Sequence, residues 1–187
     1  MHLEPPISLR PYRVEDAPAV LEAALSSVAE IRPFLPWCDP DRTLEEVRAW
    51  LEAQVQAFEA GTAFEFAILA EDGSYLGSCA LNQIESANRR ANLGYWVCTS
   101  ATRRGVATAA IRQIVRWAFE NTDLIRLEVI VSTKNVASLR TAEKAGAVRE
   151  GVLRKRLLLH GVAHDAVVFS FIREASSARN LPLPRTV

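Results

Sequence analysis

The sequence has little cysteine and no excess of either charge. Only three cysteines occur in 187 residues, and Cys38, Cys79 and Cys98 are too widely spaced for a disulfide framework or a paired zinc site. The 22 basic and 22 acidic side chains cancel, which leaves no broad electrostatic surface for nucleic acid or an anionic membrane. We therefore expect reduced thiols, no nucleic-acid partner and no membrane partner.

Segments that direct a chain to or through a membrane are also missing. No stretch approaches the roughly 18 consecutive apolar residues of a transmembrane helix. The N-terminal stretch MHLEPPISLR has neither the apolar centre nor the cleavage pattern of a signal peptide. We expect a cytoplasmic protein. Two phosphate-binding signatures are absent as well, the G-x-x-x-x-G-K-[ST] of P-loop proteins and the G-x-G-x-x-G of dinucleotide-binding folds.

Hydrophobic periodicity predicts a single α/β (α+β) domain over residues 1–174, followed by a flexible tail over 175–187. We expect a mixed, mostly antiparallel sheet of about seven strands flanked by about four helices. The strands at 91–98 and 125–131 should run parallel, because a helix connects them. The predicted helices cover 14–28, 43–61, 104–121 and 135–146, and the predicted strands cover 7–12, 64–71, 74–84, 91–98, 125–131, 148–159 and 162–172.

The stretch ATRRGVATAA, residues 101–110, marks a candidate binding site at the start of a helix. The first turn of a helix has unpaired backbone N–H groups and the positive end of the helix dipole. Gly105 leaves room for a ligand to approach the backbone, and Arg103 and Arg104 add positive charge. A phosphate group suits such a site. The alternative is that Gly105 only begins the helix and both arginines are solvated.

Residues 102–107, TRRGVA, resemble the acetyl-CoA pyrophosphate loop of the GNAT acetyltransferase superfamily, whose pattern is Q/R-x-x-G-x-G/A. Gly105 and Ala107 agree with this pattern, whereas Thr102 stands where the family usually has Gln or Arg. The resemblance covers residues 7–172 and implies the GNAT fold. Further stretches resemble the RimJ/RimL-type branch of protein N-terminal acetyltransferases, which includes ribosomal-protein enzymes: LRPY (9–12), RPFLPW (32–37), LGYWV (93–97), NVASLRTAEKAGA (135–147) and REGVLR (149–154).

The resemblance implies roles for individual residues. The strand that ends at Trp96–Cys98 would pair with the pantetheine arm, and the backbone N–H of Val97 would stabilise charge on the thioester oxygen. Asn135 would hold the cofactor and Ser138 would protonate the leaving thiolate, although Asn135 could instead only cap the short helix, with Ser138 in its first turn. The implied acetyl-CoA-binding residues are Trp96, Val97, Cys98, Arg103, Arg104, Gly105, Val106, Ala107, Thr108, Asn135 and Ser138.

The acceptor side is less completely predicted. Trp37 and Tyr95 are the expected acceptor-binding residues, although a tryptophan between prolines can equally fill a core. Some RimL-like enzymes carry a Glu seven residues beyond the Glu of their E-G pair, and the same count from Glu150 reaches Leu157, which cannot accept a proton. Glu85 is a candidate general base, with a solvated turn residue as the alternative.

The implied activity is direct acetyl transfer from acetyl-CoA to a primary amine, above all the N-terminal α-amine of a protein or peptide, with ribosomal proteins among the candidates. Two alternatives stay open: acetylation of a small amine (polyamine, amino acid or aminoglycoside), and a catalytically silent acyl-CoA-binding sensor.

A homodimer is also an expectation of the resemblance. His160, His164 and Asp165 lack a further ligand, so no metal is predicted. Cys98 could carry an acyl group, but a half-buried thiol is the simpler account.

Overall fold

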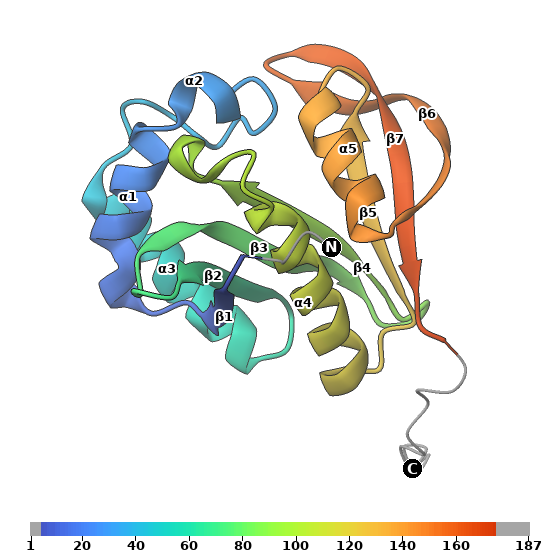
Figure 1. Ribbon diagram of the computed structural model, residues 1–187, viewed down its shortest axis with the longest axis horizontal. Helices are drawn as coiled ribbons and strands as arrows, with labels where there is room; N and C mark the ends of the chain where they lie inside the picture. The colour runs from blue at the N-terminus through green and yellow to red at the C-terminus, as the bar shows by residue number, and fades with distance from the viewer. Residues whose placement is uncertain (1–4, 175–187) are drawn as a thin grey trace.

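The computed structural model describes residues 5–174, in which a seven-stranded sheet has helices on both faces (Figure 1). The predicted tail over 175–187 lies outside the described residues. The strand order is β1-β2-β3-β4-β5-β7-β6. Every predicted strand is present: β1 (Ile7–Pro11), β2 (Phe64–Ala70), β3 (Tyr75–Glu85), β4 (Arg90–Val97), β5 (Arg126–Ser132), β6 (Val148–Leu159) and β7 (Val162–Ile172).

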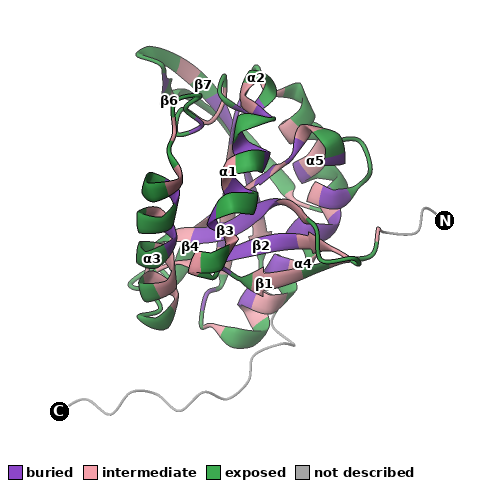
Figure 2. Ribbon diagram, turned by 90° about the vertical axis from the view of Figure 1, so that its left-hand side faces the viewer, coloured by how far each residue is buried: buried purple, intermediate pink, exposed green. Residues whose placement is uncertain are grey.

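Helices cover both faces of this sheet. The part of the chain that the structure describes contains α1 (Ala17–Leu25), α2 (Val28–Ile31), α3 (Leu44–Glu59), α4 (Val106–Asn121) and α5 (Val136–Ala145), with single 3-10 turns η1 (Val14–Asp16) and η2 (Thr99–Ala101). Helices α4 and α5 pack together on one face, whereas α1 and α3 lie on the other (Figures 1 and 2). Within residues 5–174, no helix has the length and apolar character needed to cross a membrane.

One predicted helix is divided. The segment 14–28 forms η1, α1 and the start of α2 instead of one continuous helix, because the backbone changes direction at Ser27, where φ is −120°. The Ser27 side chain is fully buried, and its hydroxyl accepts a hydrogen bond from the backbone N–H of Thr99 at 3.0 Å. This contact ties the first helices to the loop that follows β4.

Two hydrophobic clusters hold the layers together. The larger one packs the inner side of α4, with Ile111 and Ile114, against β2–β4 and β7. The smaller one joins the opposite face of the sheet to α1 and α3, and it consists of Tyr12, Ala17, Val20, Val47, Leu51 and Ala67. Side chains alternate between the two faces along each strand. Glu65 and Leu69, two residues before and after Ala67, therefore face α1 and α3 as Ala67 does.

Strands β4 and β5 run parallel, as predicted, but they pair only at their beginnings. The paired residues are Arg90–Asn92 of β4 and Arg126–Glu128 of β5. Beyond Asn92, β4 continues to pair with β3, and β5 continues to pair with β7. The two central strands consequently separate and leave a wedge-shaped opening, called the wedge below, along the second half of β4.

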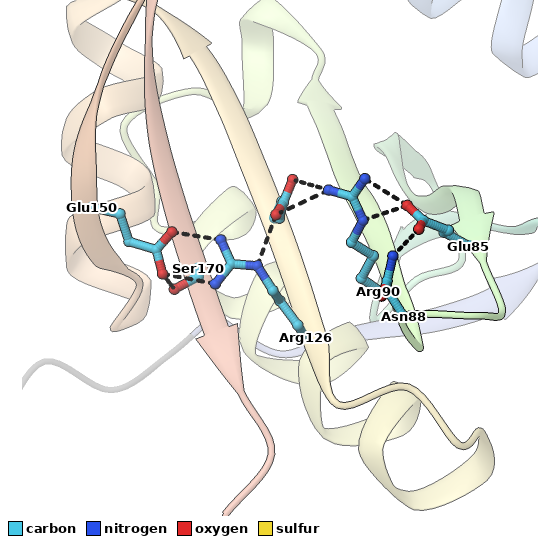
Figure 3. Close-up of polar contacts among 7 residues, drawn as sticks. Glu85, Asn88, Arg90, Arg126, Glu150 and Ser170 are labelled. Atoms are coloured by element: carbon cyan, nitrogen blue, oxygen red, sulfur yellow. Dashed lines mark hydrogen bonds and ion pairs between the residues drawn. The ribbon is translucent and has the colours of Figure 1, made fainter.

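Charged side chains bridge the strands at the closed end of the wedge (Figure 3). Arg90 on β4 contacts Glu85 of β3 at 2.5 Å and Glu128 of β5 at 3.5 Å. Arg126 bonds Glu128 at 2.7 Å and Glu150 of β6 at 2.5 Å. Exposed ion pairs contribute little one by one, but a connected row resists sliding of the strands. The separation of β4 and β5 is thus confined to the other end of the pair.

Candidate active site

The loop over residues 102–108 turns tightly into α4, as the sequence predicts. Gly105 is the N-cap residue of α4 and has a left-handed conformation with φ of 81°. Arg103 also has a positive φ, 62°, and both Arg103 and Arg104 are exposed. Neither arginine forms an ion pair with any residue in the described part of the chain. Thr102 uses its hydroxyl locally, donating to the carbonyl oxygen of Thr99 at 2.8 Å.

The backbone at the start of α4 has N–H groups to offer. The first hydrogen bond of this helix runs from the N–H of Ala109 to the carbonyl oxygen of Gly105, at 3.0 Å. The N–H groups of residues 106–108 precede that bond, and no described side chain caps the helix. These donors, the helix dipole and the exposed arginines together give this end of α4 the character of an anion site.

The edge of β4 that faces the wedge exposes backbone groups. One edge of β4 is hydrogen-bonded to β3, where the N–H of Cys98 donates to the carbonyl oxygen of Leu76 at 2.8 Å. In an antiparallel ladder, successive residues direct their N–H groups to alternate sides. The N–H of Val97 therefore points away from β3, toward the side where β5 has diverged.

Tyr95 and Ser138 meet across the wedge. The Tyr95 hydroxyl lies 2.8 Å from Ser138 Oγ and 3.1 Å from the Ser138 carbonyl oxygen, so β4 is linked to the first turn of α5. Asn135 caps α5, its side-chain oxygen accepting from the N–H of Ser138 at 3.1 Å. Burial raises the pKa of Tyr95 to about 12, which keeps its hydroxyl protonated at neutral pH. Capping therefore coexists with a Ser138 hydroxyl directed at β4.

A cavity of about 420 Å³ lies on the opposite face of β4, between the sheet and the helices α1 and α3. Trp37, predicted to line the acceptor cleft, does line this cavity, with its ring 5.6 Å from that of Trp96 in an edge-to-face contact. Trp37 is 41% exposed and thus lies at the mouth rather than in the core. The other polar or aromatic lining residues are Tyr12, Arg42, Trp50, Glu65, Ser78, Asn82, Gln83, Asn92 and Tyr95.

Glu65 is a site residue that the sequence did not single out. It lies on β2 directly across from Ala80 of β3, on the face that looks toward the cavity. Its carboxylate makes no hydrogen bond or ion pair with another described residue. Burial raises the pKa of Glu65 to about 7. The available sequence signal was a lone charge between Phe64 and Phe66 in an apolar strand.

The wedge, the anion site and the cavity converge on β4. Residues 7–148 match the family model described as the acetyltransferase (GNAT) domain. The chain belongs to this family. The predicted superfamily, its mixed α/β fold and an N-acetyltransferase class of enzyme are confirmed.

Individual relatives agree with this assignment. The "probable N-acetyltransferase YjcK" of Bacillus subtilis is 31% identical, over 89% of this chain and 93% of that protein. The ribosomal-protein-serine acetyltransferase of Escherichia coli is 25% identical, over 76% of this chain and 79% of its own. A solved structure of RimL, a ribosomal L7/L12 α-N-protein acetyltransferase in complex with coenzyme A, matches with a TM-score of 0.83 at 23% identity, over 89% of this chain and 94% of that one.

Glu85 does not suit a general base in this GNAT enzyme. It lies at the closed end of the wedge, where it pairs with Arg90 and accepts a hydrogen bond from Asn88 (Figure 3). These contacts lower the pKa of Glu85, whereas a base needs a pKa raised toward neutrality. The prediction placed Glu85 correctly near the end of β3, but its partner on β4 holds it as an unreactive carboxylate.

Two other candidate groups have ordinary structural roles. Cys98 is buried, and burial raises the pKa of its thiol to about 11, which favours an inert thiol over an acyl-carrying cysteine. The Nε2 atom of His160 lies 2.8 Å from the carbonyl oxygen of Arg32, which links the β6–β7 turn to the loop after α2. Across residues 5–174, no group of three or more His, Cys, Asp or Glu side chains is arranged to hold a metal ion.

Proposed function

We propose that this GNAT acetyltransferase uses acetyl-CoA and acetylates the N-terminal α-amine of a protein or peptide. The observation that carries the proposal is the convergence on β4 of an anion site, a free backbone edge and an open cavity on the opposite face. A cofactor bound along one side and an acceptor bound on the other would meet at the edge of a single strand, as direct transfer requires.

The residues around the wedge suit acetyl-CoA. The free N–H groups of residues 106–108 and the charges of Arg103 and Arg104 suit its pyrophosphate, and Gly105 adds no side chain there. The free edge of Trp96–Cys98 suits hydrogen bonding to the amides of a pantetheine arm. When bound, acetyl-CoA supplies an acetyl group activated as a thioester. Support for this ligand also comes from the RimL structure, which contains coenzyme A.

The chain's own groups then have separate tasks. The N–H of Val97 stabilises negative charge that develops on the carbonyl oxygen. Ser138 donates a proton to the departing sulfur, and Tyr95, bonded to Ser138 Oγ, orients that hydroxyl. An α-amine has a pKa near ~8 against ~10.4 for a lysine side chain, so it loses its proton with little assistance. The lack of a dedicated base at Glu85 or Leu157 is therefore compatible with an N-terminal acceptor.

Two observations favour a protein or peptide N-terminus as the acceptor. Two similar proteins carry names that specify ribosomal-protein acceptors, the Escherichia coli serine acetyltransferase and RimL. The cavity is large enough for the first residues of an extended peptide, and Trp37 at its mouth gives an aromatic surface for the chain that continues outward.

The first test is calorimetric titration with acetyl-CoA, followed by an assay of thiol release with N-terminal peptides, spermidine and free amino acids. Binding together with peptide-dependent thiol release is the expected result. Turnover of spermidine or amino acids alone would assign the acceptor to small amines. Binding without turnover on any amine would favour a silent acyl-CoA sensor, and the absence of binding would refute acetyl-CoA as the ligand.

Removing the Ser138 hydroxyl should affect turnover and not cofactor affinity. We expect Ser138→Ala to lower kcat by about a hundredfold, the usual size of a general acid's contribution, with little change in the dissociation constant of acetyl-CoA. Tyr95→Phe should have a smaller effect of the same kind. Thr141→Ala is a matched control, since the Thr141 hydroxyl bonds only the backbone of its own helix. A Ser138→Ala enzyme with wild-type kcat would remove Ser138 from the mechanism.

A further inference from the structure

The cavity next to β4 has one acidic side chain on its wall. Among the described residues that line it, Glu65 is the only carboxylate, and Arg42 is the only cation. The Arg42 guanidinium lies 5.8 Å from the ring centroids of Trp37 and Trp50 and donates to the carbonyl oxygen of Trp37. Arg42 is thus engaged at the mouth and makes no ion pair with Glu65. A carboxylate that is partly removed from water and has no partner among the described residues favours a positively charged ligand.

The other groups near Glu65 cannot neutralise it. Tyr12 and Tyr75 share a hydrogen bond of 2.5 Å between their hydroxyls, and burial raises the pKa of each, so both remain neutral. Cys79 lies on the opposite face of the sheet, and burial keeps its thiol protonated. The carboxylate of Glu65 is therefore the one negative charge on this wall whenever it is ionised.

Register fixes how far Glu65 lies from the reacting edge. Glu65 is paired with Ala80, and Ala80 is paired with Gly94 of β4. Two steps between neighbouring strands amount to about 10 Å, and Val97 lies three residues beyond Gly94, about another 10 Å along β4, so the backbones of Glu65 and Val97 are roughly 14 Å apart. Glu65 is thus too far from the free edge of β4 to take a proton directly from the attacking amine, but it can hold a second group of the acceptor.

We propose that Glu65 binds a second positive charge of the acceptor, and that the enzyme therefore prefers N-terminal peptides with Lys or Arg at the second position; this inference rests on the proposed function. An extended lysine at that position places its ammonium up to about 10 Å from the α-nitrogen, and the Glu65 side chain can span the remaining few ångströms. The rings of Tyr12, Trp50 and Trp96 line the path and suit both the alkyl stem and the cation.

The binding test uses unreactive probes and needs no acetyl-CoA. N-acetylated tripeptide amides with Lys or with Gln at the second position carry no α-amine charge, so their affinities report only the second position. By calorimetry we expect the wild type to bind the Lys probe at least about tenfold more tightly than the Gln probe. The Glu65→Gln variant should bind the two probes equally. Glu85→Gln, which removes a carboxylate outside the cavity, should keep the full preference.

The pH dependence gives a second readout. Glu65 is mostly protonated below its pKa of about 7 and ionised above it. The lysine probe stays charged throughout, and Tyr12 and Tyr75 stay protonated because burial raises the pKa of each hydroxyl. Affinity for the lysine probe should therefore rise about tenfold from pH 6 to pH 8. The same series with Glu65→Gln should be flat, and a flat series in the wild type would contradict a role for the Glu65 charge.

Turnover separates this inference from the function on which it rests. Comparing kcat/KM for free peptides with Lys or Gln at the second position, we expect the preference to lie in KM and to vanish in Glu65→Gln. If the enzyme instead acetylates spermidine, and does so with a KM that depends on Glu65, the second positive charge belongs to a free polyamine and not to a peptide. Turnover of both peptides without preference would overturn the inference and leave the function intact, whereas turnover of no amine would overturn the function itself.

Discussion

Replacing Gly105 by aspartate should weaken acetyl-CoA binding by about a hundredfold relative to replacing it by asparagine. Gly105 precedes the free N–H groups of residues 106–108, where the pyrophosphate would lie. A carboxylate near those donors repels a bound phosphate by about 3 kcal/mol at the intermediate dielectric of a protein surface. It also occupies the donors that the phosphate needs.

Asparagine is the matched control because it has nearly the same size and shape as aspartate but carries no charge. Both tolerate the left-handed conformation that Gly105 adopts, with φ of 81°, and both are favourable N-cap residues. A Cβ at this position would approach Pro5 Cδ at 3.4 Å, an ordinary contact, so neither variant is excluded sterically. Any strain is therefore common to both proteins.

Calorimetry of acetyl-CoA with both variants, repeated at low and high salt, measures this effect. The gap between the aspartate and asparagine variants should narrow as salt screens the charge. Thermal melting should show the aspartate variant to be no less stable, since a negative charge at a helix N-terminus is favourable. Equal affinities for acetyl-CoA would show that the pyrophosphate does not bind at the start of α4.

Most of the fold follows from local patterns. Alternating apolar residues bounded by turn signals gave every strand, and the turn at His160–Gly161 separates β6 from β7 as expected. The break at Ser27 was not predictable, because it depends on a hydrogen bond to Thr99, which is distant in sequence. Helical periodicity continues through residues 14–28 and contains no sign of that contact.

In the candidate site, too, the local features could be predicted from the sequence, whereas the features that depend on tertiary structure could not. The turn at Gly105 lies within one short segment, so its motif could be recognised directly. The contact of Tyr95 with Ser138 and the position of Glu65 both depend on strand register and on how far β4 diverges from β5. Glu85 illustrates the converse, because its chain position suggested a base while the pairing of β3 with β4 gave it Arg90 as a partner.

At Gly77, the addition of a single methyl group should strongly reduce both stability and activity. It lies on β3 opposite Val97 and has φ of 146°. A Cβ there would lie 2.2 Å from the Trp96 carbonyl oxygen and 2.7 Å from Val97 Cα. These are backbone atoms, which cannot swing aside as a side chain would. Gly77→Ala must therefore displace the segment of β4 that offers its free edge to the wedge.

We expect Gly77→Ala to lower the free energy of unfolding by about 3 kcal/mol or more, as overpacking adds to backbone strain. Urea titration measures this loss, and kcat/KM determined well below the melting temperature should also fall at least about tenfold. Gly73→Ala is the control, since Gly73 has a φ of 84° but no atom within 4 Å of the added Cβ. Gly73→Ala has the backbone strain of a positive φ but no steric clash with neighbouring atoms, so the variant should retain its activity. If both variants lost the same stability and activity, the close approach of β3 to Trp96 and Val97 would not be what positions the free edge of β4.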